Sequence, residues 1–329
     1  MKKINRNFKK CLITGIAGSG GSYLAEHILT QDKKIQIYGL YRSDKFKKIL
    51  EKKFKKRIIF YKIDLNNFQK TKKIIQKIKP DLVFNLASNA DVRKSFDFPH
   101  KFIANNLHTT LNLLESIRKC NLKSLFIHCS TSEVYGVVSK KETPITENQR
   151  MRPVSPYAVS KSFQDLLSQL YIQVYGLNII ITRMFTYNNP RRLNLFQSSF
   201  ASQISKIEKG KQKILSHGNL NSIRSFLDLH DAMEAYWVTA KKGKVGEIYN
   251  IGGNKFFKVA DFLKKMIHFS KNKIKCKVDK NLLRTKDVTL QIPSVNKFKN
   301  HTKWKSTISF EKSLLNLLNE FRKKTNILK

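Results

Sequence analysis

Short runs of apolar and β-branched residues alternate with helical patterns along most of this chain, and no other feature constrains its fold as strongly. Each run has the length of one buried strand. Strands that alternate with helices predict a parallel sheet covered on both faces, and right-handed crossovers make such a sheet doubly wound. We therefore expect an α/β fold of the Rossmann type, with ligands at the carboxyl ends of the strands. The seven runs are residues 11–15, 35–41, 58–64, 82–88, 125–131, 178–185 and 247–253.

The alternation ends after residue 185. A Pro-Arg-Arg loop, a helical pattern over residues 195–209 and a lysine-rich remainder follow; the remainder holds one more strand-like stretch and an amphipathic helix over 310–321. We expect a smaller C-terminal substrate domain whose parts are interleaved with the last strand of the sheet. The expected dinucleotide-binding domain comprises residues 1–185 and about 228–253, and the expected substrate-binding domain comprises about 186–227 and 254–329.

Three glycines follow the first predicted strand at GxxGxxG spacing: Gly15, Gly18 and Gly21. A helix is expected to begin at about Ser22. Glycine allows a tight turn and a close approach of the backbone to a pyrophosphate, whose charge then meets the free N–H groups of the helix. Turns collect glycine in any case, but a strand before and a helix after this turn favour a dinucleotide site.

The end of the second strand bears on the choice of cofactor. Arg42 stands there, where an NAD site usually carries an acid, and a guanidinium suits the 2′-phosphate of NADP. The alternative is a surface arginine with Asp44 reaching the ribose, so NAD stays possible. Residues that end the third and fourth strands are expected to border the cofactor as well: Asp64, Leu65, Leu86, Ala87 and Ser88.

Ser155 and Pro156 mark a helix start, with Ser155 as the N-cap and Pro156 in the first helical position. Tyr157 and Lys161 then lie four residues apart on one face. A phenol is a poor base at neutral pH, but a neighbouring ammonium stabilises the phenolate and is expected to lower the pKa of Tyr157. Such a pair can take a proton from a sugar hydroxyl while hydride leaves the same carbon for a nicotinamide.

The glycine turn, the segment STSEVYG at 130–136 and the YxxxK pair together resemble the extended short-chain dehydrogenase/reductases that act on nucleotide sugars, the NAD-dependent epimerase/dehydratase family. The resemblance covers nearly the whole chain and is strongest to the GDP-mannose 4,6-dehydratase branch. The segments that carry it are TGIAGSGGSYLAE, STSEVYG, RPVSPYAVSK, the PRR of NNPRR, HGNLNSIRSF and RTKDV.

The resemblance implies catalytic roles for Thr131 and Glu133, beside those of Tyr157 and Lys161. Oxidation at C4 of the hexose acidifies the proton at C5; a carboxylate can remove that proton and then help the C6 hydroxyl leave as water. The structural alternatives are a Glu133 that caps a helix or pairs with a lysine, and a Thr131 with an idle hydroxyl.

Arginine suits the two phosphates and the base of a GDP-sugar. By resemblance we expect Arg224 at the diphosphate and Arg284 with Asp287 at the nucleoside, which leaves Arg191 and Arg192 at the substrate or at a neighbouring subunit of a homodimer or homotetramer. The dehydratases usually have Asn where this chain has Thr186, another expected substrate contact. The alternatives are a reductase of GDP-4-keto-6-deoxymannose and another nucleotide-sugar epimerase/dehydratase.

The net charge of +41 alone would suggest a nucleic-acid partner. The excess is mostly lysine, with 51 residues scattered through every segment. The densest run, residues 44–57, predicts a solvated amphipathic helix with Phe46, Ile49, Leu50 and Phe54 on its apolar stripe. We therefore expect a nucleotide-sugar substrate and no nucleic-acid partner; a non-enzymatic nucleic-acid binder is the alternative from another class.

The four cysteines, at 11, 120, 129 and 276, form no CxxC pair and suggest free buried thiols in a reducing compartment. We expect no metal site. The N-terminal apolar stretch is broken by glycines and leads into the glycine turn, so we expect no signal peptide. No apolar run approaches the roughly 20 residues of a membrane span, and a cytoplasmic protein without a membrane partner is predicted.

Overall fold

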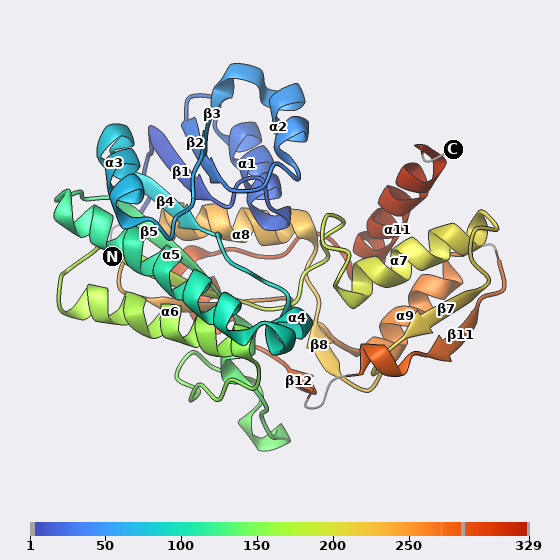
Figure 1. The fold of residues 1–329 in the computed structure, drawn as a ribbon. Helices are drawn as coiled ribbons and strands as arrows, with labels where there is room; N and C mark the ends of the chain where they lie inside the picture. The colour runs from blue at the N-terminus through green and yellow to red at the C-terminus, as the bar shows by residue number, and fades with distance from the viewer. Residues whose placement is uncertain (1–3, 271, 284–286, 328–329) are drawn as a thin grey trace.

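The computed structural model describes residues 4–270, 272–283 and 287–327 and has an α/β architecture (Figure 1). Seven parallel strands form one large sheet in the order β3-β2-β1-β4-β5-β6-β9, so the expected doubly wound parallel sheet is confirmed. All seven predicted strands are present. They are β1 (Lys10–Thr14), β2 (Gln36–Tyr41), β3 (Ile58–Lys62), β4 (Leu82–Asn85), β5 (Leu125–Thr131), β6 (Ile179–Met184) and β9 (Ile248–Ile251).

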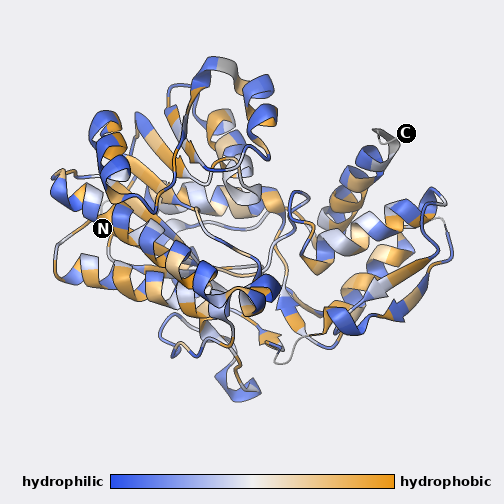
Figure 2. Cartoon of the chain, viewed as in Figure 1, coloured by the Kyte–Doolittle hydropathy of each residue, from blue (hydrophilic) through white to orange (hydrophobic). Residues whose placement is uncertain are grey.

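The central strands are apolar on both faces because helices cover both. Every residue of β4 and of β6 is buried. Successive side chains of one strand enter different clusters: Leu12 packs with α3, α5 and α6, whereas Cys11 and Ile13 pack with α1 and α8. The helices that cover the face of Leu12 are α3 (Phe68–Ile78), α5 (Pro99–Lys119) and α6 (Pro156–Gln173). The helices that cover the opposite face are α1 (Ser19–Gln31), α2 (Lys47–Phe54), α8 (Leu229–Lys242) and α10 (Asn296–Thr302). A short helix, α4 (Val92–Asp97), precedes α5. In Figure 2 the strands of the large sheet are mostly orange, as this burial requires.

Helix α1 begins earlier than the sequence suggested. It starts at Ser19, with Gly18 as its N-cap, rather than at about Ser22. Gly21 therefore lies inside the helix, where a Cβ atom would stand 2.4 Å from the carbonyl oxygen of Gly15. Only glycine fits this tight contact between the helix and the turn, so Gly21 allows α1 to pack closely against Gly15.

The lysine-rich helix α2 covers less of residues 44–57 than predicted and continues into a 3-10 turn, η1 (Lys55–Arg57). Leu50 is fully buried, but Ile49 is 44% exposed and does not belong to the apolar stripe. The observed helix therefore buries fewer apolar side chains than the predicted longer helix would.

The C-terminal part has its own core between three helices: α7 (Phe196–Glu208), α9 (Val259–His268) and α11 (Phe310–Ile327). Its described residues form two small sheets, β10-β8-β12 and β11-β7, where the sequence suggested only one strand. The sequence missed most of them because two to four residues are too few to show a period of two. They are β7 (Ile214–His217), β8 (Ile223–Ser225), β10 (Phe256–Lys258), β11 (Lys275–Val278) and β12 (Leu290–Gln291).

Within the described ranges, no helix combines the length and the apolar character needed to span a bilayer. The cysteines of these ranges are unpaired; Cys11 and Cys129 are buried, whereas Cys276 is exposed, contrary to the expectation that all four thiols are buried.

Candidate active site

A cavity of about 410 Å³ opens at the carboxyl ends of the central strands, between the large sheet and the C-terminal part. It brings together residues that the sequence separates by more than 250 positions. The predicted site residues on its lining are Gly15, Gly18, Gly21, Leu86, Ser88, Thr131, Glu133, Tyr157, Lys161, Thr186, Arg192, Arg224 and Asp287.

Other predicted residues lie outside this lining. Arg42 is exposed after β2 and donates to Asn105 at 3.0 Å, and Asp64 is an exposed acceptor for the backbone N–H of Asn66. Leu65 is 7% exposed and belongs to the hydrophobic core, and Ala87 packs there partly buried. Arg284 lies outside the described residues.

The glycine turn forms a cradle without side chains. Gly15 has a positive φ of 66°, and a Cβ atom there would lie 3.0 Å from the Cα atom of Ala87. Gly20, which the sequence reasoning missed, also lines the cavity, and its Cβ atom would point towards Leu86 and Tyr187. The N-cap of α1 is Gly18, which has no side chain to cap the helix. The free N–H groups and the open cradle fit a dinucleotide pyrophosphate.

Tyr157 and Lys161 are held at the start of α6. The Ser155 hydroxyl accepts from the backbone N–H of Ala158 at 3.1 Å, and Pro156 occupies the first turn, as predicted. The Lys161 ammonium donates to the carbonyl oxygen of Cys129 at 2.8 Å, which fixes the ammonium against the C-terminal end of β5. Burial lowers the pKa of Lys161 to about 8.

The expected depression of the phenol pKa by Lys161 is not seen. Burial raises the pKa of Tyr157, because desolvation of the phenolate outweighs the opposing influences. Those influences are the positive charge of Arg192 and a hydrogen bond with Thr131, while the charge of Glu133 raises the pKa further. The Lys161 ammonium instead donates its hydrogen bond to the backbone carbonyl of Cys129.

Thr131 is the last residue of β5 and the N-cap of a 3-10 turn, η2 (Ser132–Tyr135), which contains Glu133. The Thr131 hydroxyl accepts from the backbone N–H of Glu133 at 3.3 Å and thereby starts the turn. Glu133 lines the cavity, and its carboxylate accepts from the side-chain amide of Gln291 at 3.2 Å. The carboxyl group therefore faces the same space as Tyr157.

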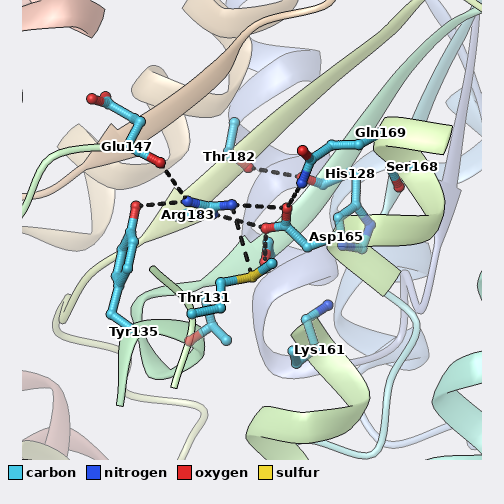
Figure 3. Close-up of polar contacts among 12 residues, drawn as sticks. His128, Thr131, Tyr135, Glu147, Lys161, Asp165, Ser168, Gln169, Thr182 and Arg183 are labelled. Carbon is cyan, nitrogen blue, oxygen red and sulfur yellow. Dashed lines mark hydrogen bonds and ion pairs between the residues drawn. The ribbon is translucent and has the colours of Figure 1, made fainter. Parts of the chain in front are cut away.

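A buried ion pair lies behind these residues, and the sequence reasoning missed it (Figure 3). Arg183 of β6 and Asp165 of α6 are 2% and 0% exposed and share two hydrogen bonds, at 2.9 and 3.0 Å. Asp165 also accepts from Ser130 of β5, and Arg183 donates to the hydroxyl of Tyr135 in η2. The pair thus joins all the elements that carry Thr131, Glu133, Tyr157 and Lys161. The only signal in the sequence was a charged residue inside an apolar run.

The C-terminal wall of the cavity contains a nearly buried guanidinium. Arg224 of β8 is 7% exposed and lies 3.8 Å from Asp287. Asp287 also accepts from the side chains of Asn219 at 2.8 Å and Ser222 at 3.1 Å, which hold its carboxylate in place.

Helix α7 begins on this wall, a feature that the sequence reasoning did not use. Its N-cap, Leu195, offers no side-chain hydrogen bond, and its first turn carries no acid. Gln197 lines the cavity, is fully buried, and has no hydrogen-bond partner for its amide among the described residues. A positive helix end beside Arg224 suits a negatively charged group.

The adjacent arginines after β6 face different ways. Arg192 lines the cavity and donates to the backbone carbonyl of Ala90. Arg191 does not line it; its guanidinium pairs with Glu26 of α1 at 2.5 Å and stacks on the ring of Tyr23. Arg191 therefore lies outside this cavity, with its charge matched by Glu26, and a contact with the substrate or with a neighbouring subunit stays a prediction.

A family model described as GDP-mannose 4,6 dehydratase matches residues 12–316. A dTDP-glucose 4,6-dehydratase of Haemophilus influenzae is 33% identical over 255 residues, which cover 74% of each chain. A GDP-mannose 4,6-dehydratase of Vibrio cholerae is 32% identical over 70% of this chain and 64% of its own length. The solved dTDP-glucose 4,6-dehydratase of Bacillus anthracis, in complex with NAD, superposes with a TM-score of 0.82 at 24% identity, covering 97% of this chain and 98% of that one.

The family model spans most of the chain, from β1 to α11, and the fold neighbour shares the doubly wound sheet. The chain belongs to the GDP-mannose 4,6 dehydratase family.

Proposed function

We propose that this protein is an NADP-dependent GDP-mannose 4,6-dehydratase that forms GDP-4-keto-6-deoxymannose. The observation that carries the proposal is the single cavity lined by Glu133, Tyr157 and the glycine cradle. An oxidoreductase of one carbon needs Tyr157 alone as proton acceptor, whereas removal of water from C5 and C6 needs a second acid/base group. A nicotinamide dinucleotide bound in the cradle supplies the hydride acceptor for C4 and the hydride donor for C6.

Tyr157 takes the proton of the C4 hydroxyl in this proposal. Only the phenolate can accept this proton. Burial raises the pKa of Tyr157, and the positive charge of Arg192 and the hydrogen bond with Thr131 oppose that rise and favour the phenolate. Lys161, fixed against Cys129, holds the face of α6 that carries the phenol.

Glu133 acts at C5 and C6. The new ketone at C4 acidifies the C5 proton, the ionised carboxylate removes it, and the protonated acid then gives it to the departing C6 hydroxyl. When hydride is added at C6, C5 takes up one proton, which balances the proton that Tyr157 removed from the C4 hydroxyl. Gly136, at the end of the same turn, has a Cβ position 1.7 Å from the carbonyl oxygen of Arg152, so the backbone after Glu133 is packed against a neighbouring segment. This packing restrains the backbone beside Glu133, so its carboxylate keeps its position while it transfers the proton from C5 to the C6 hydroxyl.

The diphosphate of the substrate is assigned to Arg224 and the N-terminus of α7, and residues 186–227 and 254–329 are assigned to substrate binding. Arg224 supplies a guanidinium and α7 supplies uncapped N–H groups on the same wall. Asp287 is assigned to the nucleoside together with Arg284. The assignment of guanine and mannose to the substrate is based on the description of the matching family model. The similarity to a dTDP-glucose 4,6-dehydratase makes dTDP-glucose the competing substrate.

NADP is proposed over NAD because Arg42 lies exposed at the end of β2, among the side chains of Asn89 and Asn105. Asp44, the group that would favour NAD, lies 3.7 Å from Lys62. Fold neighbours have been solved with NAD and with NADPH. An Arg42→Ala variant should lose affinity for NADP and keep its affinity for NAD; equal losses would reject the preference for NADP.

A homodimer is proposed through the outer face of α6. Its charged residues, Lys161 and Asp165, are both buried, so its exposed face is uncharged in a chain of net charge +41. A second copy fits such a face because an uncharged apolar contact adds no like charges at the interface between two copies of so basic a chain. The exposed apolar residues at helical spacing are Val159, Phe163, Leu166, Leu170 and Val174. Sedimentation of a Leu166→Lys variant should show a monomer, and an unchanged dimer would reject this face.

The decisive experiment offers GDP-, dTDP-, CDP- and UDP-sugars with catalytic NADP and follows loss of one water by mass spectrometry. GDP-mannose should give a dehydrated product without net change in NADPH. Net consumption of NADPH with GDP-4-keto-6-deoxymannose, and no product from GDP-mannose, would identify the sister reductase instead.

The unpaired cysteines agree with the cytoplasmic, reducing location proposed here.

A further inference from the structure

Gln291 reaches the catalytic cavity from the far end of the chain. It is the second residue of β12, is 3% exposed and lines the cavity. Its side-chain amide donates to one carboxylate oxygen of Glu133 at 3.2 Å, across 158 residues of sequence. Neither sequence pattern nor resemblance pointed to this residue.

The backbone of Gln291 is fixed on two sides. On one side β12 pairs in parallel with β8, where Gln291 stands opposite Arg224. On the other side the next residues pair with Ile145: the N–H of Ile145 donates to Ile292 at 2.7 Å, and the N–H of Ser294 donates to Ile145 at 2.8 Å. The strand therefore cannot shift without breaking pairing on both sides.

A chain of hydrogen bonds leads from this strand back to Glu133. The carbonyl of Ile145 accepts from the amide of Asn250 at 2.9 Å. Asn250 in turn accepts from the hydroxyl of Tyr135 at 2.6 Å, and Tyr135 belongs to the same 3-10 turn as Glu133. Donor and acceptor of the contact between Gln291 and Glu133 are thus held relative to each other by a closed circuit.

We propose that Gln291 is a positioning residue for Glu133 and that it couples this acid to the anion-binding wall at Arg224; the inference rests on the proposed function. An amide donor on one carboxylate oxygen fixes the orientation of the carboxylate and leaves the other oxygen for the proton at C5. Because Gln291 and Arg224 are register partners, a diphosphate that draws on Arg224 acts on the strand that orients the acid. Substrate binding and acid placement then depend on one pair of short strands.

A Gln291→Met variant removes the donor and keeps the length of the side chain. Its matched control is Leu290→Met, in the same strand, where the partly buried side chain packs against the apolar cluster that contains Val134 and Phe185. With GDP-mannose, Gln291→Met should lower kcat about 10- to 100-fold and leave KM within about twofold, since the lost contact orients a catalytic group. Leu290→Met should keep the kcat of the wild type.

Two further readouts separate positioning from a merely structural role. Oxidation at C4 does not use Glu133, so reduced nicotinamide should accumulate in Gln291→Met, and exchange of the C5 proton with deuterated water should slow. A wild-type kcat, or oxidation and elimination slowed equally, would overturn the role of Gln291. No dehydrated product from the wild type would overturn the proposed function and this inference with it.

Coupling to Arg224 is tested by the double variant Gln291→Met/Arg224→Lys. If the two residues act through one strand pair, the loss of kcat/KM in the double variant should be smaller than the product of the single losses by at least about threefold. Independent, multiplicative losses would remove the coupling and leave only the contact between Gln291 and Glu133.

Discussion

The two walls of the cavity are built differently. The sheet wall rests on long elements: β5 has seven residues, six of them buried, and α6 runs for 18 residues. The C-terminal wall rests on β8 and β12, which have three and two residues, and on side-chain contacts such as those around Asp287. Long buried elements hold side chains more rigidly than short strands and loops do.

This difference suggests a division of labour. The groups proposed for bond breaking stand on the sheet wall, where a fixed geometry matters most for rate. The groups proposed for phosphate recognition stand on the C-terminal wall, where small adjustments to a ligand cost less. Gln291 is the exception, because it lies on the C-terminal wall and contacts an acid of the sheet wall. Changes on the sheet wall should thus affect kcat or stability, and changes on the other wall should affect KM.

The largest effect is expected from Glu133→Gln on the sheet wall. Water elimination should slow by about 100- to 10,000-fold, because the variant cannot carry a proton, while cofactor binding and oxidation at C4 persist. Product formation and nicotinamide absorbance measure the two parts. Elimination at the wild-type rate would refute the assigned role and, with it, the concentration of chemistry on this wall.

Arg183→Met should destabilise the same wall by about 3–5 kcal/mol, because it leaves the fully buried Asp165 carboxylate without its partner. Denaturant unfolding measures the loss. Lys47→Met, which breaks the partly exposed pair between Lys47 and Glu51 in α2, is the control and should cost far less than Arg183→Met. Equal costs for both variants would show that the buried pair does not brace the wall.

The buried Lys161 predicts a pH dependence of stability. Its pKa falls from 10.5 to about 8 on folding, so the unfolded chain binds more protons between these values. Stability should therefore rise with pH across this window, by about 3 kcal/mol in total, and stay level below it. The rise should be absent from Lys161→Met. Unfolding free energies measured from pH 7 to 11 check this, and parallel profiles for both proteins would contradict it.

The smallest effect is expected on the C-terminal wall. Arg224→Lys keeps the charge but loses the planar fork that grips phosphate, so KM for GDP-mannose should rise about tenfold with kcat within about twofold. Arg118→Lys, whose arginine pairs with Glu115 outside the cavity, should leave both constants unchanged. A fall in kcat with constant KM would break the division of labour between the walls.

The sequence predicted the sheet wall well. It allowed us to infer all seven strands, the glycine turn, and the meeting of Thr131, Glu133 and Tyr157 at one edge. Apolar runs along the chain mark the strands, and the carboxyl ends of the strands in a parallel sheet lie at the same edge. The exact start of α1 was missed, because packing against Gly15 decides it.

The tertiary structure alone decided the rest. The sequence shows no pattern for the opposite directions of Arg191 and Arg192 or for the contact of Gln291 with Glu133. For the buried pair of Arg183 and Asp165 it shows only a charged residue inside an apolar run. Each depends on contacts between segments far apart in sequence, and the strands that place Gln291 are too short to show a period. The local pattern of the chain thus determined where chemistry belongs, and only long-range packing determined which side chains hold it in place.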